Sequence, residues 1–160
     1  MNWRSLFLAL DFWAACAASV LVRLLLPVYI KSEFAKDIYG VAIGILSILF
    51  SVFFAALAII MASTDDQFVK FMEDAGDYSR LISTMLFTLR SLFVALVVSI
   101  LLYVHSSFRI SAGVEHQRRW LLDSFAFLFT YALFASLAAT HDAIRYSQYR
   151  IRFLRTDTDQ

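Results

Sequence analysis

The feature that most constrains the fold is a run of 27 residues, 38–64, without a single charged side chain. An α-helix of about 20 mainly apolar residues crosses the roughly 30 Å hydrocarbon core of a bilayer. Across the 160 residues, 61% are hydrophobic and only 17% are charged, against roughly 25% charged in soluble domains. A soluble core of this size cannot bury that much apolar surface. The chain is therefore predicted to be a helical integral membrane protein.

Four apolar segments are predicted to be transmembrane helices, at about residues 6–30, 38–62, 81–104 and 120–140. Their apolar runs are continuous rather than alternating, so they are not expected to be membrane strands. Residues 31–37 and 105–119 are expected to be short connections. The predicted fold class is all-α integral membrane, with one membrane domain over residues 1–160 and no separate soluble domain.

Two further helices are predicted outside the spans. Residues 65–75, between the second and third spans, place apolar side chains on one helix face, so this segment is predicted to be a short cytosolic amphipathic helix. Thr64 and Gln67 fit a capping box at its start, and Gly76 fits its end. Residues 141–155 are predicted to continue the fourth span as a basic helical extension.

Four spans place both termini on the same side of the membrane. Seven Lys or Arg residues near the spans lie on that side, against five on the other, and basic residues near spans favour the cytoplasm. Both termini are therefore expected to be cytoplasmic.

Small residues recur every three or four positions along the second span, at Gly40, Gly44, Ser47, Ser51, Ala55, Ala58 and Ala62. Helices in lipid associate through close van der Waals contact, which small side chains permit. This face is expected to pack against another helix, either within the chain or in a second subunit, where it could also line a pore. A second small stripe follows the third span, at Thr84, Thr88, Ser91, Ala95 and Ser99.

Four ionisable residues lie inside the predicted spans: Asp11, Arg23, Arg90 and Asp123. Such residues are costly in a bilayer and normally find partners. Their depths, at 1.5 Å per residue, predict an Asp11–Arg90 pair in the inner half and an Arg23–Asp123 pair in the outer half. Two interpretations remain open: ion pairs that fix helix register, or a polar pathway or switch.

Oppositely charged segments lie on the predicted cytoplasmic side. The middle segment is acidic at Asp65, Asp66, Glu73, Asp74 and Asp77, and the tail is basic at Arg145, Arg150, Arg152 and Arg155. The acidic segment is expected to meet the tail or to dock a basic surface of another protein. The tail is expected to bind anionic lipid, a cytosolic protein or, least of all, nucleic acid. Expected partners are membrane lipids, a second copy and a cytosolic protein, with no direct nucleic acid.

No motif predicts catalysis or a cofactor. His105 and His116 are eleven residues apart, unlike the close ligand pairs of zinc sites. No catalytic residue, metal site or cofactor is therefore assigned, and the protein is predicted not to be an enzyme.

The layout resembles small four-span bacterial membrane proteins encoded beside anti-phage defence genes. The likeness lies in the acidic segment 65–75 and the tail over residues 142–154. It implies a bacterial inner-membrane protein that acts with a cytosolic partner. Two functions follow as hypotheses: a self-associating membrane subunit that anchors or signals to that partner, or an oligomeric pore that depolarises the membrane.

Overall fold

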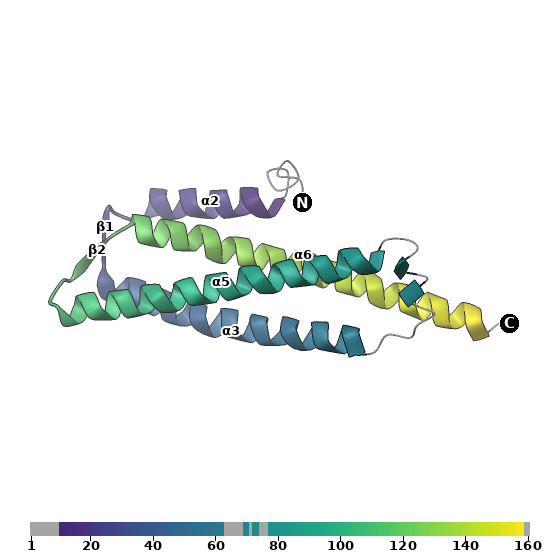
Figure 1. The fold of residues 1–160 in the computed structure, drawn as a ribbon. Helices are drawn as coiled ribbons and strands as arrows, with labels where there is room; N and C mark the ends of the chain where they lie inside the picture. Colours follow the sequence, from purple (N-terminus) through teal and green to yellow (C-terminus); the bar gives the residue numbers. More distant parts are fainter. Residues whose placement is uncertain (1–9, 63–68, 71, 74–76, 159–160) are drawn as a thin grey trace.

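The structure is a computed structural model, which describes residues 10–62, 69–70, 72–73 and 77–158, without the side chains of residues 10, 11, 77, 150 and 152–158. Its elements are the helices α2 (Leu10–Leu25), α3 (Ser32–Ala62), α5 (Asp77–Ser111) and α6 (Trp120–Thr158), and the strands β1 (Tyr29–Lys31) and β2 (His116–Arg118). The helices form an elongated bundle (Figure 1). The prediction of an all-α fold is confirmed for these residues, apart from the two short strands.

Within the described residues, three helices are long and apolar enough to cross a membrane, over Ser32–Ala62, Tyr78–Ser111 and Trp120–Tyr149. The predicted first span corresponds to a shorter apolar helix, Phe12–Leu25. The 35 residues of α5 and the 39 of α6 extend about 52 Å and 58 Å, well beyond a hydrocarbon core of roughly 30 Å. Both helices are therefore too long to lie wholly within a bilayer.

The first predicted span ends earlier than expected. The helix α2 stops at Leu25, whereas the prediction continued to residue 30. Pro27 explains the difference, because its ring disfavours helical geometry at the preceding residue. Residues 29–31 form β1 instead.

The predicted connection at residues 31–37 is wrong, because α3 begins at Ser32. Ser32 is fully buried; its backbone N–H donates to Glu115 O at 2.7 Å and its hydroxyl donates to Val114 O at 3.1 Å. Contacts with a segment more than 80 residues away fix this helix start, so local sequence could not reveal it.

The second predicted connection, residues 105–119, is also mostly structured. The helix α5 continues to Ser111, and Gly113 then adopts a positive φ of 73° that turns the chain. β2 follows and pairs antiparallel with β1, in the register Tyr29↔Arg118, Ile30↔Gln117 and Lys31↔His116. This sheet, which was not predicted, closes one end of the bundle, here called the sheet end; the opposite end, where α6 finishes, is called the tail end (Figure 1).

Helix pairing places the core between α3, α5 and α6, while α2 packs along α6. The larger buried cluster includes Leu46, Leu92 and Ala95 and extends to Tyr146. A second cluster at the sheet end includes Tyr39 and Phe125, whose rings meet edge to face at 4.9 Å. Large apolar side chains also cover the outside of all four helices, as a lipid-facing surface requires.

The helix α6 runs without a break to Thr158, so residues 141–155 are helical. Its apolar stretch 124–140 carries no charged residue, and 18 helical residues follow it, about 27 Å in length. The beginning of α2 and the end of α6 point toward the same end of the bundle (Figure 1).

Candidate functional site

The small residues of α3 lie mostly on its outer surface. Gly44, Ser51, Ala55, Ala58 and Ala62 are exposed, and Gly40 and Ser47 are half-buried; these seven residues are called the α3 small face. The side of α3 that enters the core carries larger residues, among them Tyr39, Leu46, Phe53 and Leu57. The centres of the two sets are about 135° apart around the helix at 3.6 residues per turn. Apart from the half-buried Gly40 and Ser47, the α3 small face therefore does not pack α3 into its own bundle.

The two glycines of this face differ in what surrounds them. A Cβ at Gly40 would meet the Tyr103 ring at 3.5 Å, an ordinary contact, whereas a Cβ at Gly44 would meet nothing within 4 Å. The Ser51 hydroxyl donates back to Ser47 O at 2.9 Å, so it is satisfied within the helix. Among the described residues, no neighbour lies close enough to Gly44 to explain why this position is a glycine.

The small stripe of α5 behaves in the opposite way. Thr88, Ala95 and Ser99 are buried, and the Thr88 hydroxyl donates to Ala135 O of α6 at 3.2 Å. Ala132 and Ala139 of α6 are also buried, so small residues line both sides of this seam. The α5 stripe is thus the close-packing surface inside the bundle.

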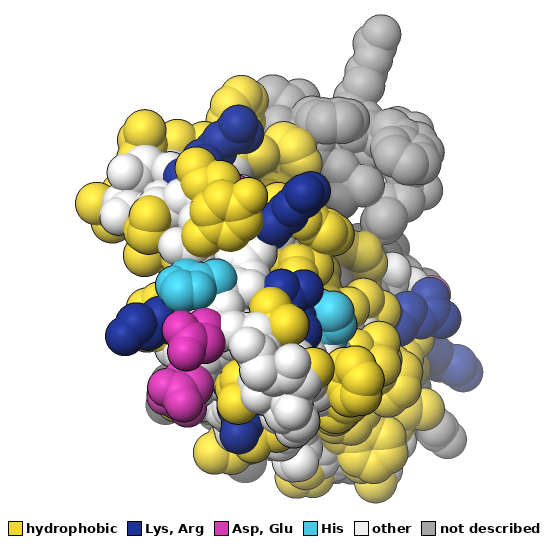
Figure 2. Space-filling view, turned by 90° about the vertical axis from the view of Figure 1, so that its left-hand side faces the viewer, with side chains coloured by type: hydrophobic (Ala, Val, Ile, Leu, Met, Phe, Trp, Pro, Cys, Tyr) yellow, Lys and Arg dark blue, Asp and Glu magenta, His cyan; other side chains and the backbone are white. Residues whose placement is uncertain are grey.

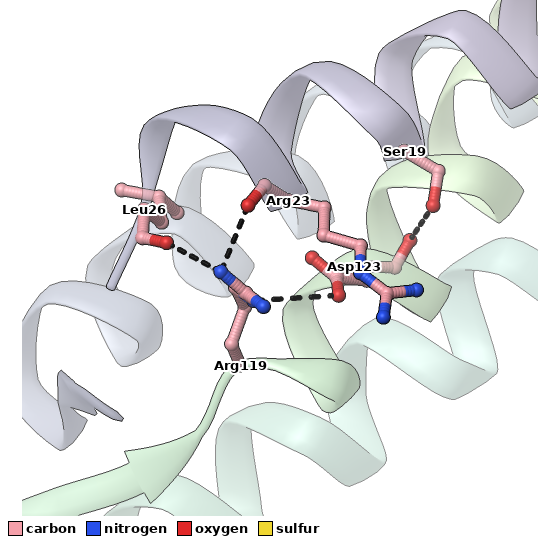
Figure 3. A network of polar contacts seen from close by, with 5 residues as sticks. All are labelled: Ser19, Arg23, Leu26, Arg119 and Asp123. Atoms are coloured by element: carbon pink, nitrogen blue, oxygen red, sulfur yellow. Dashed lines mark hydrogen bonds and ion pairs between the residues drawn. The ribbon is translucent and has the colours of Figure 1, made fainter. Parts of the chain in front are cut away.

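A polar network at the sheet end ties α2 to α6 (Figure 3). Arg119 Nη1 donates to Arg23 O at 2.8 Å and to Leu26 O at 2.7 Å, which satisfies carbonyls at the end of α2. Arg119 Nε lies 3.8 Å from Asp123 Oδ2, and the Ser19 hydroxyl donates to Asp123 O at 3.2 Å. Sequence reasoning missed Arg119, because nothing local marks it as the partner of a helix end almost 100 residues away.

The predicted Arg23–Asp123 ion pair is replaced by a different one. Among the described side chains, Asp123 pairs with Arg119, while Arg23 has no ion pair, although it lines a surface hollow together with both of them. Figure 3 shows the Arg23 side chain extending alongside Asp123. The depth argument therefore placed the two residues at the same level, and the nearer cation is the one that pairs.

Arg90 is exposed on α5 and lines a hollow of about 410 Å³ together with Ser79, Ser83 and Phe87. The Asp11 side chain lies outside the described residues, so the predicted Asp11–Arg90 pair stays a prediction. Its neighbour Phe12 begins a row of ring contacts that crosses α6 and ends beside the hollow: Phe12–Phe127 at 5.8 Å, Phe127–Tyr131 at 6.3 Å and Tyr131–Phe87 at 6.4 Å. These contacts place α2 on the same side of the bundle as Arg90.

The charged residues predicted to dock partners are described only in part. Asp65, Asp66 and Asp74 lie outside the described residues, as do the side chains of Asp77, Arg150, Arg152 and Arg155. The capping box at Thr64 and Gln67, and Gly76, also lie outside them. Glu73 accepts a hydrogen bond from Ser79 at 2.7 Å, and Arg145 is exposed.

The middle segment contacts the tail through apolar side chains. Met72 is buried in the same cluster as Tyr146 of α6, and both line a small hollow of about 40 Å³ with Arg80, Asp142 and Arg145. Met72 of the middle segment and Tyr146 of the tail therefore share a buried apolar cluster, while the predicted meeting of the acidic and basic side chains stays a prediction.

Gln117 is a buried polar residue that sequence reasoning did not single out. It is 1% exposed, and its Oε1 accepts a hydrogen bond from the Ser106 hydroxyl at 3.1 Å. It is the middle residue of β2, flanked by the exposed His116 and Arg118. Alternation over three residues is too short a signal to predict burial.

Among the described residues no three His, Cys, Asp or Glu side chains gather as metal ligands.

No family model, curated protein or solved structure is significantly similar to this chain. The sites above therefore rest on the geometry of this chain alone.

Proposed function

We propose that the chain is a non-enzymatic membrane subunit that associates with further copies through the α3 small face and holds a cytosolic partner at its tail end. One observation carries the proposal: five of the seven residues of the α3 small face are exposed, and this face is turned away from the side of α3 that packs into the core. Gly44 supports it most directly, since a Cβ there would meet nothing within 4 Å.

The physical reason is the environment of the helix. Apolar side chains gain little by leaving lipid for another helix, so helix association depends on close approach of the backbones. The buried stripe of α5 uses small residues in this way inside the chain, at Thr88 and Ala95. An exposed face of the same kind on α3 fits a second subunit that approaches equally closely.

The tail end supplies the proposed docking surface for a cytosolic protein. The last 18 residues of α6 continue about 27 Å beyond its charge-free stretch. Arg145 of this extension is exposed, and it lines a hollow with Arg80 of α5 and one carboxylate, Asp142, so the two arginines outnumber the acid there. In this proposal the protein lies in a bacterial inner membrane with its tail end in the cytoplasm. Its proposed biological role is in phage defence.

Self-association is tested with Gly44→Leu and a control, Ala138→Leu, which places the same leucine side chain at an exposed position of α6 and adds three carbon atoms instead of four. Native mass spectrometry, or single-molecule photobleaching in bilayers, counts the subunits. Gly44→Leu is expected to shift the protein toward monomers while Ala138→Leu keeps the wild-type distribution. A monomeric wild type, or equal effects of both substitutions, would refute self-association through α3.

Docking is tested by charge reversal at Arg145. Removing residues 141–160 would also remove Tyr146, which is buried in the core, so Arg145→Glu is the cleaner change. Reduced recovery of a cytosolic protein that wild type retains in detergent would support docking. Unchanged recovery would exclude Arg145 from the contact.

The exposed Arg90 favours a second candidate, an oligomeric ion-conducting pore. Arg90, Ser83 and Ser79 form a polar line on the surface of α5, and exposed charges inside a candidate span favour a water-filled path. Conductance in liposomes separates this function from the first. A current that Arg90→Gln alters and Arg145→Gln leaves unchanged would favour the pore. The absence of any current from the wild-type protein would favour the anchoring subunit.

A further inference from the structure

A hollow of about 350 Å³ lies at the sheet end, where α2 ends and α6 begins. Arg23, Arg118 and Arg119 line it together with Asp123, Tyr29 and Trp120. Figure 2 looks onto this end of the molecule, where Lys and Arg side chains stand among hydrophobic ones and acidic side chains gather at one edge. The hollow therefore combines several cations with an apolar rim.

The charges of the hollow do not balance. Three guanidinium groups face one carboxylate, which leaves a net charge of +2 (three minus one). Arg119 is already committed, because it donates to two carbonyls of α2 and pairs with Asp123. Arg23 and Arg118 are exposed and have no ion pair among the described residues. Two cations are thus left to face whatever enters the hollow.

The position of the hollow fits the depth of lipid headgroups. Trp120 is the first residue of α6 and of its candidate membrane span. Trp120 and Tyr29 are 58% and 59% exposed, and such aromatic residues concentrate at the boundary between lipid and water. Val20, three residues before Arg23 and therefore on the same side of α2, is exposed and offers an apolar surface beneath the hollow.

Guanidinium groups match the geometry of phosphate oxygens and hold them with charge-assisted hydrogen bonds. The positive end of the α6 helix dipole, at Trp120, adds to the attraction for an anion. Basic pockets between membrane helices bind phospholipid headgroups for these reasons.

We propose that this hollow binds the phosphate of an anionic phospholipid, with Arg23 and Arg118 as the donors. Tyr29 and Trp120 flank the headgroup, and an acyl chain follows the apolar surface of α2 at Val20. Arg119 and Asp123 hold the end of α2 in place beside the ligand. The site is independent of the α3 small face and of the tail end.

The test uses the full chain in a neutral detergent, with phosphatidylglycerol, phosphatidylethanolamine or phosphatidylcholine added and the bound lipids counted by native mass spectrometry. Phosphatidylglycerol is expected to bind more tightly than either zwitterionic lipid. Arg23→Gln with Arg118→Gln should weaken its binding at least about tenfold, since two charge-assisted hydrogen bonds are lost. The matched control, Arg90→Gln with Lys70→Gln, removes two exposed cations outside the hollow and outside the basic tail, and should leave binding unchanged.

Three results would overturn the proposal. One is equal binding of all three lipids, and another is equal weakening by the double variant and its control. The third is competition by inorganic phosphate that matches the affinity of the lipid, because a free phosphate would then be the ligand. Helical circular dichroism and the elution volume of each variant verify that both doubles keep the fold.

Discussion

The helices α3 and α5 each carry a stripe of small residues at the same three-to-four-residue spacing, and the two stripes face opposite environments. Thr88, Ala95 and Ser99 of α5 are buried against neighbouring helices. Gly44, Ser51 and Ala58 of α3 are exposed. Small residues at helical spacing therefore indicate where another helix can approach closely. They do not indicate which helix packs there, because that depends on how the whole bundle is arranged.

Adding bulk to the buried stripe should have the largest effect. Ala95 is fully buried, so Ala95→Leu inserts three carbon atoms into a packed seam and is expected to lower the free energy of unfolding by about 1–3 kcal/mol or to prevent folding. Denaturation in detergent micelles, followed by circular dichroism, measures the change. Wild-type stability in this variant would mean that the α5 stripe is not a close-packed surface.

The helix α2 is attached in a third way, by polar contacts rather than by a small stripe. Arg119→Gln removes the two hydrogen bonds to Arg23 O and Leu26 O and the ion pair with Asp123. The expected cost is about 1–3 kcal/mol for the groups left unpaired, concentrated at α2. Hydrogen exchange should rise in α2 and stay unchanged in the middle of α5, and Arg118→Gln serves as the neighbouring control. Equal exchange in both variants would refute the anchoring role.

A smaller effect is expected from one hydrogen bond of the buried seam. Thr88→Val keeps the shape of the side chain and removes its bond to Ala135 O. Hydrogen bonds between membrane helices contribute about 0.6 kcal/mol on average, so the loss of stability should be of that size. The same denaturation experiment detects it. A loss as large as that of Ala95→Leu would show that Thr88 does more than donate this bond.

Adding bulk to the exposed stripe should have the smallest effect on the stability of the single subunit. Ala58→Leu makes the same chemical change as Ala95→Leu, at an exposed position. Its unfolding free energy, measured under conditions that keep the protein monomeric, should stay within about 0.5 kcal/mol of wild type. A large decrease in the free energy of unfolding would show that Ala58 packs inside the bundle. The α3 and α5 stripes would then no longer differ in burial.

Sequence alone predicted the features that depend on long apolar runs. The segments 38–62, 81–104 and 120–140 all lie within helices, because length and hydropathy specify helices strongly. It failed at the sheet end, where Ser32 starts a helix through contacts with Val114 and Glu115 and where two three-residue strands pair across the chain. Such contacts leave no periodic signal. It also paired Asp123 with Arg23, since depth along a helix does not reveal that Arg119 lies one turn away.

Cysteine cross-linking of α3 between subunits tests self-association most directly. In a Cys16→Ser background, Ser51→Cys places a thiol on the α3 small face, and Val52→Cys places one at the same depth about 100° around the helix. Subunits inserted in the same orientation bring equal depths together, and a disulfide forms only when two Cα atoms approach to roughly 4–7 Å. Efficient dimer formation by Ser51→Cys in bilayers, with little by Val52→Cys, is the predicted result. Absence of dimers from Ser51→Cys, or equal yields from both positions, would contradict an α3-mediated assembly.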